Sequence, residues 1–225
     1  MTGLGRDYTI TLIKEIRIAL CELLRERGYH GCEWTFSSEQ DLQACLYHLA
    51  YNASSEHIAS RNVWLGVEAQ PRWFLHDLGN EFFRTFGFTE SIDEVRHTIE
   101  KALKVADYSG KRSPRFDLAL LARTGNSRPH LHIWETKFFS LSLTPMNTLR
   151  SCLRDARRVA TFKGALEPIM RISGEVIWVD PYSTCKDSTW SEIGRQIKNW
   201  NQLCRTVPIR LWAYSKTGTL LRVGF

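Results

Sequence analysis

Two acidic residues interrupt apolar runs near the middle of this 225-residue sequence. Asp117 lies in the run Phe-Asp-Leu-Ala-Leu-Leu, and Glu135 ends the run Leu-His-Ile-Trp-Glu. The stretch between the runs, 124–129, is rich in turn-forming residues, so the pattern predicts a β-hairpin. A hairpin centred on Asn126 pairs residues that are equally distant from it. Asp117 would then face Glu135 on one side of the sheet, with Cβ atoms roughly 5 Å apart.

This pair of carboxylates predicts a metal site. A carboxylate in an apolar strand loses hydration, and two facing carboxylates also repel each other. A divalent metal ion between them compensates both costs and suits oxygen ligands. Lys137 follows Glu135 by two residues, so strand alternation places it on the same face. Its ammonium group could stabilise the negative charge that develops during phosphodiester hydrolysis. The alternative interpretation is a structural salt-bridge network on the sheet.

The order of these residues resembles a known nuclease signature. Asp117, followed by Glu135-Thr136-Lys137 at the end of the next strand, resembles the motif of the PD-(D/E)XK superfamily, which includes restriction endonucleases and Holliday-junction resolvases. The resemblance covers about residues 89–180. It implies that Asp117 and Glu135 bind Mg²⁺, for which Mn²⁺ substitutes, and that the Thr136 carbonyl is a further ligand. Lys137 would orient or activate water.

The resemblance leaves two points open. The residue before the aspartate is Phe116, and the nearest proline is Pro114, so the motif's proline is displaced. Members of the superfamily often add an acidic residue from the preceding helix, although each candidate here could equally be a solvated helix charge. The candidates are Glu94, which is best placed, and then Glu90, Glu100 and Glu81.

A basic stripe follows the hairpin. Thr144-Pro145 is typical of a helix start, and the predicted helix ends near Gly164. The arginines on one side of this helix are balanced only by Asp155. The helix after the E-x-K strand borders the active site in nucleases of this type, so these arginines are predicted to bind nucleic-acid phosphates. A solvated charge stripe stays open as the alternative. The arginines are Arg150, Arg154, Arg157 and Arg158.

Composition narrows the function class further. Lys and Arg total 30 against 24 Asp and Glu, and this basic surplus favours a polyanionic partner. No signal peptide is visible, no apolar run reaches the length of a membrane span, and the six cysteines form no C-x-x-C pair. We therefore expect a cytoplasmic protein without a membrane partner. His130 and His132 would lie on the sheet face opposite Glu135, as packing or surface residues rather than metal ligands.

Apolar periodicity predicts the elements that position the site. The order of helices and strands after residue 88 indicates an α/β fold with a central mixed sheet. Expected helices cover 8–27, a segment beginning after an N-cap at Ser37 with a capping box to Gln40, 72–86, 89–103, 144–164 and 189–204. Expected strands cover 62–68, 104–108, 115–123, 130–139 and 175–180, with a terminal hairpin at 209–225.

These patterns lead to one main hypothesis. We expect an α/β protein with a restriction-endonuclease-like core of order α-β-β-β-α-β at 89–225, and a mainly helical N-terminal elaboration at 1–88. It would be a Mg²⁺-dependent nuclease acting on DNA, in restriction, phage defence, mobile-element or repair pathways; RNA stays open as a substrate. The alternative is an inactive or complex-dependent nucleic-acid-binding subunit with the same fold. Assembly as a homodimer or in a larger complex is left open.

Overall fold

The computed structural model describes most of the chain. The described residues are 8–27, 38–60, 62–69, 86, 88–105, 115–122, 128–138, 144–180, 187–214 and 220–224. Among them, no helix combines the length and the apolar character that a membrane crossing requires.

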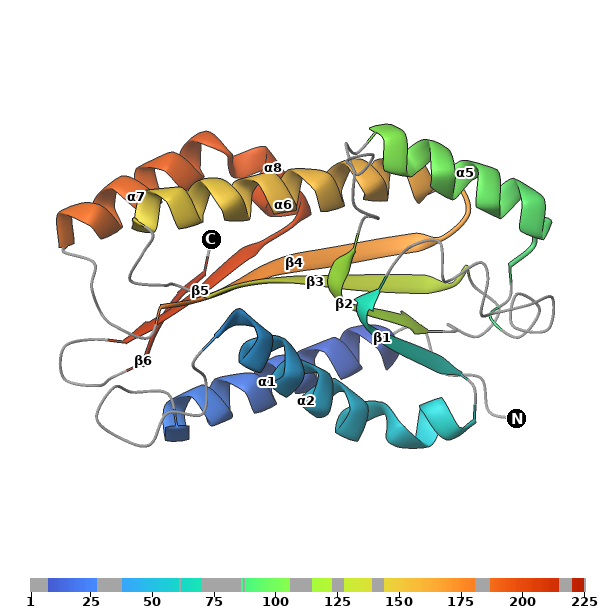
Figure 1. The fold of residues 1–225 in the computed structure, drawn as a ribbon, viewed down its shortest axis with the longest axis horizontal. Helices are drawn as coiled ribbons and strands as arrows, with labels where there is room; N and C mark the ends of the chain where they lie inside the picture. The colour runs from blue at the N-terminus through green and yellow to red at the C-terminus, as the bar shows by residue number, and fades with distance from the viewer. Residues whose placement is uncertain are drawn as a thin grey trace.

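A six-stranded mixed sheet forms the centre of the molecule, with its strands side by side in chain order (Figure 1). The pairs β1–β2, β2–β3 and β5–β6 are antiparallel, whereas β3–β4 and β4–β5 are parallel. Parallel neighbours need a crossover connection, and helices supply it here. The strands are β1 (Val63–Ala69), β2 (Phe116–Ala122), β3 (His130–Phe138), β4 (Arg171–Asp180), β5 (Ile209–Tyr214) and β6 (Leu220–Gly224).

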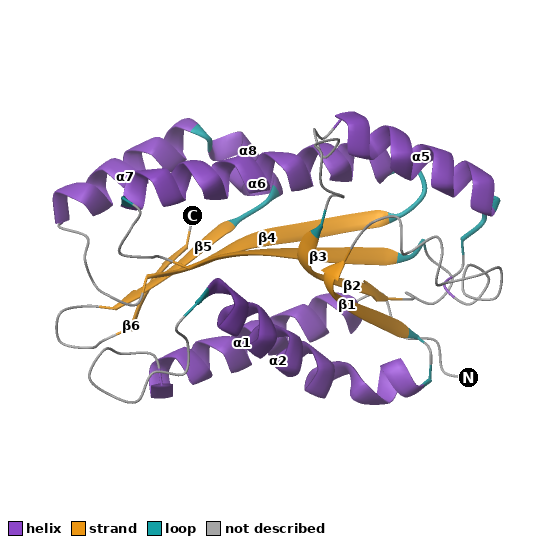
Figure 2. Ribbon diagram, viewed as in Figure 1, coloured by secondary structure: helices purple, strands orange, loops and turns teal. Residues whose placement is uncertain are grey.

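Helices cover both faces of the sheet and make a three-layer arrangement (Figures 1 and 2). Each face has its own hydrophobic core, which we call the upper core under α5 to α8 and the lower core under α1 and α2. The helices are α1 (Tyr8–Arg27), α2 (Glu39–Ala59), α5 (Ile92–Val105), α6 (Pro145–Leu166), α7 (Asp187–Asn199) and α8 (Asn201–Thr206). The expectation of a mixed sheet flanked by helices is confirmed.

Strand β3 shows how the sequence serves both cores. Its residues alternate between the faces, with Leu131 and Ile133 in the upper core and Trp134 in the lower core. Helix α6 approaches the sheet closely at Gly174 of β4, where an added Cβ would lie 2.6 Å from Cγ1 of Val159. This close approach fixes the height of α6 above β3 and β4, and therefore the position of the side chains that α6 directs at the sheet.

The hairpin and most elements after it match their predictions. The register of β2 and β3 is the predicted one, because Leu118 pairs with Trp134 and Ala122 with His130. Helix α6 begins at Pro145 after an N-cap at Thr144, whose side chain accepts from the Asn147 N–H. The helix continues beyond the predicted end near residue 164 to Leu166, which is buried in the upper core.

Other boundaries differ from the predictions. The N-cap of α2 is Ser38, one residue later than predicted, because the Ser38 hydroxyl accepts from the Asp41 N–H. The predicted helix 189–204 is instead two helices, α7 and α8, with a break at Trp200. Strand β4 begins at Arg171, earlier than the predicted 175, because β3 pairs with it from His130 onward.

The strand beside β2 comes from an unexpected part of the chain. The sequence suggested 104–108 for it, but residues 104 and 105 are the end of α5, and the rest of that stretch lies outside the described residues. Strand β1 occupies the place instead, pairing Val63 with Ala122. Among the described residues, the N-terminal region thus supplies one strand of the sheet and the two helices of its lower face. The predicted helix 72–86 lies outside the described residues, except for Phe86.

Candidate active site

Asp117 and Glu135 lie near each other at one end of the hairpin. The pairing of β2 with β3 runs to Leu118 and Trp134, the residues next to the two acids, and the charge of Asp117 raises the pKa of Glu135. Glu135 follows the alternation of Leu131 and Ile133 and lies on the α6 side of the sheet. Phe116 and Ala119 both belong to the upper core, so the alternation of β2 is interrupted beside Asp117, and the predicted direct facing of the two carboxylates is not established by the strand pairing.

Glu135 is a buried acid, 6% exposed, on the α6 side of the sheet. Within the described part of the chain, no hydrogen bond or ion pair within 4 Å reaches its carboxylate. Burial and the negative charges of Asp117 and Asp155 outweigh the positive charges of Lys137 and Arg158, so the pKa of Glu135 lies well above its ordinary value. A cation placed beside this carboxylate would relieve the unfavourable charge.

Thr136 holds Asp117 in place. Its backbone N–H and its hydroxyl both donate to Oδ2 of Asp117, at 2.7 and 2.8 Å. The sequence resemblance assigned the Thr136 carbonyl to a metal, and in this structure that oxygen accepts a hydrogen bond from Nζ of Lys137 at 2.7 Å. Thr136 therefore positions two neighbouring side chains of the site, one through its donors and one through its acceptor.

Lys137 lies among four carboxylates. Its ammonium nitrogen is 3.0 Å from Oδ2 of Asp155 and 3.5 Å from Oε1 of Glu39. Burial lowers the pKa of Lys137, but the charges of Asp155, Glu39, Asp117 and Glu135 outweigh it, so the pKa lies above its ordinary value. The side chain thus remains a cation at any pH at which the protein works.

Glu39 is a site residue that the sequence analysis missed. It begins α2 on the lower side of the sheet, and its carboxylate accepts from the backbone N–H of Phe138. Burial raises the pKa of Glu39, Lys137 lowers it, and Asp117 raises it further, for a net increase. An acid in the first turn of a helix is ordinary near the positive end of the helix dipole, so nothing local marked it as functional.

Asp155 is the second missed residue. The sequence suggested only that it balanced the arginines of its helix. It is 5% exposed, and it points from α6 toward the end of β3. There it joins Lys137 to Arg158, whose guanidinium nitrogen is 3.5 Å from Oδ1 of Asp155.

The helix glutamates suggested as an additional ligand are elsewhere or serve other roles. Glu94 forms a capping box with Ser91, accepting from its N–H at 2.9 Å and its hydroxyl at 2.8 Å. Glu90 accepts from the Thr89 N–H, and Glu100 is exposed on α5. Glu81 lies outside the described residues. The additional acids near the described site are Glu39 and Asp155, both beside Lys137.

The donor set fits a hard divalent cation in part. Among the described residues, no group of three or more His, Cys, Asp or Glu side chains is arranged to hold a metal ion. Mg²⁺, however, keeps several waters and is commonly bound by one or two carboxylates. The neighbouring acids Asp117 and Glu135 supply two, and the buried carboxylate of Glu135, which has no ion pair within 4 Å among the described residues, is an observation that a cation would explain. The residues therefore fit Mg²⁺ better than a metal that needs nitrogen or sulfur ligands.

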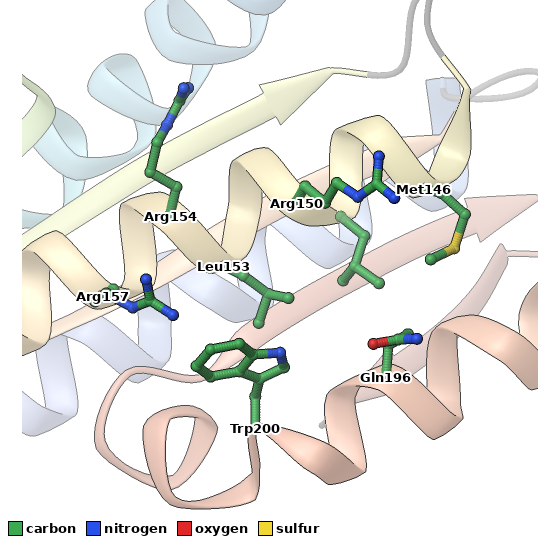
Figure 3. Close-up of a pocket in the computed structure, with 8 residues that line it drawn as sticks. Met146, Arg150, Leu153, Arg154, Arg157, Gln196 and Trp200 are labelled. Atoms are coloured by element: carbon green, nitrogen blue, oxygen red, sulfur yellow. The ribbon is translucent and has the colours of Figure 1, made fainter.

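The four predicted phosphate-binding arginines divide between two places. Arg158 lies beside the site through its contact with Asp155. Arg150, Arg154 and Arg157 line a groove between α6 and the end of α7, with Trp200 at one end (Figure 3). Arg154 also reaches Asp155, with its Nε 3.8 Å from Oδ1, so it lies between the groove and the site. The sequence did not distinguish these two directions, and phosphate binding by the four arginines stays a prediction.

The other sheet face carries a separate polar cluster. His130 and His132 share this lower face, as predicted. Nε2 of His130 and Nδ1 of His132 each lie 2.7 Å from the hydroxyl oxygen of Ser173. Glu175, on the same face, accepts from Nε of Arg17 at 2.8 Å and also pairs with Arg210. Burial lowers the pKa of His130 to about 4. Nε2 of His132 lies 3.8 Å from Oε1 of Glu175, beyond hydrogen-bond distance. These residues contact one another and lie apart from Glu135, on the opposite face of the sheet.

Comparisons with known proteins add little. No protein-family model matches the sequence, and no curated protein matches it. Among solved structures, Pyrococcus furiosus SfsA in complex with Ca²⁺ is similar over 59% of this chain and 61% of that chain, with 13% sequence identity and a TM-score of 0.23. A TM-score this low supports no argument. The functional case therefore depends on the geometry of the chain itself.

Proposed function

We propose that this protein is a Mg²⁺-dependent nuclease whose centre is Asp117, Glu135 and Lys137. The observation that carries the proposal is the pair of neighbouring acids at the hairpin end, one of them buried with a raised pKa, beside a lysine that stays charged. The fold around them would be a restriction-endonuclease-like core. In that assignment its first helix and strand are α2 and β1, rather than the segments after residue 88 that the sequence suggested.

The residues of the centre have separable roles in the proposed hydrolysis. Asp117 and Glu135 would hold Mg²⁺, which when bound activates water and neutralises phosphate charge. Lys137 is held by Asp155 and Thr136 and would stabilise the negative charge of the transition state. Because its pKa is raised, Lys137 serves as a fixed cation rather than as a proton acceptor. Glu39 is more exposed, and its raised pKa brings its basicity closer to neutral pH, so it would accept the proton from water.

The alternative function is a nucleic-acid-binding subunit with the same fold and no activity of its own. One observation favours it: no three-residue metal-binding group is found among the described residues. On this alternative the four acids and Lys137 would be a structural charge network. The arginines of α6 would then be the functional surface.

Cleavage assays separate the two functions. Supercoiled and linear duplex DNA, single-stranded DNA and RNA would be incubated with the protein in Mg²⁺, in Mn²⁺ and in chelator. We expect metal-dependent cleavage of DNA that falls roughly 100- to 1,000-fold in Lys137→Ala. Lys101→Ala, which removes an exposed lysine of α5, is the matched control and should keep full activity. Equal cleavage by Lys137→Ala, or cleavage that survives the chelator, would exclude the proposed centre, and salt-sensitive binding without cleavage would favour the alternative.

A further inference from the structure

A groove of about 310 Å³ lies between α6 and the end of α7 (Figure 3). Leu149 and Leu153 of α6 form an apolar part of its wall, and Leu153 points toward the ring of Trp200. Trp200 lies in the break between α7 and α8 and is 36% exposed, which makes it one of the exposed large apolar side chains of the described chain. A tryptophan that is partly exposed to solvent beside an apolar wall is suited to bind a flat ring.

The groove is strongly basic. Arg150, Arg154 and Arg157 line it, and none of the described residues that line it is acidic. Arg150 donates to the side chain of Asn147, a neutral group, so this contact leaves its positive charge available. Arg154 donates to the Ser151 hydroxyl and also lies 3.8 Å from Oδ1 of Asp155, with its side chain 64% exposed. This charge selects an anionic ligand.

The aromatic and cationic groups of the groove are already combined. The guanidinium carbon of Arg157 lies 4.6 Å from the centroid of the Trp200 ring. Unpaired nucleic-acid bases stack on aromatic rings and on guanidinium planes, so an Arg–Trp pair offers either surface. Gln196 donates its amide N–H to Glu192, and its amide oxygen, on the side of Trp200, can accept from a base.

We propose that this groove binds one unpaired nucleotide of a single-stranded nucleic acid. The base would stack on the Trp200–Arg157 pair against Leu153, and the flanking phosphates would contact Arg150 and Arg154. The volume of the groove is at the lower end of the range for ligand pockets, so the groove suits a single nucleotide better than a duplex. A stacked base would be read by shape, so the groove would tolerate many sequences.

The position of the groove gives this site a role beside the proposed centre, and in this respect it depends on the proposed function. Asp155 points to the centre, whereas Arg157, two residues later on α6, points to the groove. The two sites are therefore on different sides of one helix, which is roughly 10–12 Å across. Arg154 and Arg158 lie between them around the exposed side of α6. A single strand leaving the centre could follow these arginines into the groove.

Binding measurements without metal test the proposal apart from cleavage. Fluorescence anisotropy in chelator would compare labelled oligothymidylate with a mixed-sequence duplex of equal length, and unlabelled polyglutamate would serve as a competing polyanion of protein type. We expect Trp200→Ala to weaken oligothymidylate binding about tenfold and to leave duplex binding unchanged, because only an unpaired base stacks. Trp200→Phe should retain most of the affinity.

A second variant guards against a fold defect at the α7–α8 break. Arg150→Ala removes one phosphate contact without touching Trp200 and should reduce the salt dependence of oligothymidylate binding by about one ion. Arg195→Ala, an exposed arginine of α7 paired with Glu192 outside the groove, is the matched control. The inference is overturned if Trp200→Ala folds normally and binds oligothymidylate like the wild type, or if it weakens the duplex equally. Stronger competition by polyglutamate than by oligothymidylate would assign the groove to a protein partner instead.

The outcomes also separate this inference from the proposed function. A wild-type protein that binds single strands through Trp200 but cleaves nothing would support the groove and reject the nuclease. If the wild type cleaves DNA but Trp200→Ala binds oligothymidylate equally well, the nuclease is supported and the nucleotide-binding groove is rejected.

Discussion

The two faces of the sheet each bury a glutamate, and the two differ in what surrounds them. On the lower face Glu175 is fully buried and is contacted by Arg17, Arg210 and the indole N–H of Trp134. Burial raises the pKa of Glu175, but interactions with His132 and Arg17 outweigh it, so the pKa lies well below its ordinary value. This charge is compensated within the chain.

On the upper face Glu135 has no ion pair within 4 Å among the described residues. Burial, Asp117 and Asp155 raise its pKa, and they outweigh the opposite effect of Lys137 and Arg158. The same residue type at similar depth thus has opposite pKa shifts on the two faces. A buried acid held by arginines completes a structural network, whereas a buried acid next to further acids is relieved by protonation or by a cation from outside. Under the proposed function this contrast makes the upper face the catalytic one, and the following predictions test it.

The largest expected effect is on catalysis. Glu135→Gln keeps the size of the side chain but removes a charge that would hold Mg²⁺, so we expect a loss of roughly 1,000-fold in cleavage rate, equivalent to several kcal/mol. Initial rates on linear duplex DNA would measure it. Glu100→Gln, an exposed acid of α5, should cleave like the wild type. A Glu135→Gln protein that retains full activity would remove the distinction between the two glutamates.

The corresponding change on the lower face should affect stability. Glu175→Gln leaves Arg17 and Arg210 without their shared carboxylate, and we expect the free energy of unfolding to fall by about 3 kcal/mol. Urea denaturation at neutral pH would show this loss. Glu135→Gln should lose no stability in the same assay, because it removes an unfavourable buried charge. Similar destabilisation by both substitutions would contradict the contrast.

The two glutamates should also give opposite pH dependences in metal-free buffer. The pKa of Glu135 is raised in the folded protein, so the folded state holds a proton that the unfolded chain loses, and stability declines as pH rises from the ordinary value of 4.5 through the raised pKa. The pKa of Glu175 is lowered, so its contribution is present above 4.5 and is lost as pH falls below it.

Urea denaturation at several pH values checks this sign. Relative to the wild type, Glu135→Gln should gain stability as pH increases above 4.5, whereas the deficit of Glu175→Gln should shrink below that pH. If the stability differences of the two variants from the wild type changed with pH in the same direction, the opposite pKa shifts would be contradicted. Adding Mg²⁺ should stabilise the wild type at neutral pH more than it stabilises Glu135→Gln.

The smallest expected effect concerns the orientation of Lys137. Asp155→Asn removes its nearest carboxylate partner, and we expect about a tenfold loss in kcat with little change in KM, as for other residues that orient a functional group. Glu192→Gln, which removes an acid paired with Arg195 on α7, is the matched control. A change confined to KM would assign Asp155 to substrate binding instead.

The sequence predicted the local parts of this arrangement well. The turn residues and apolar alternation fix the β2–β3 hairpin as far as the Leu118–Trp134 pair, because both signals are local. They did not reveal the interrupted alternation at Phe116, which belongs to the upper core together with Ala119. The capped start of α6 was equally visible. These features needed no knowledge of the rest of the fold.

The missed parts all depend on distant contacts. Glu39 meets Lys137 across 98 positions of sequence, and its place in a first helical turn looked ordinary. Asp155 looked like a surface counter-charge because the direction of the sheet from α6 was unknown. The strand next to β2 was sought at 104–108, where the apolar period of α5 simply continues to Val105, and the chain used β1 instead.

The position of Lys137 between Glu39 and Asp155 has a consequence for folding. Glu39 begins a helix of the lower layer, and Asp155 belongs to a helix of the upper layer, so the lysine is held from both sides of the sheet at its end. Only a chain in which both layers have docked has the complete arrangement. Under the proposed function, a nascent or locally opened molecule would be inert toward nucleic acid, and hydrolysis would serve as a readout of tertiary assembly.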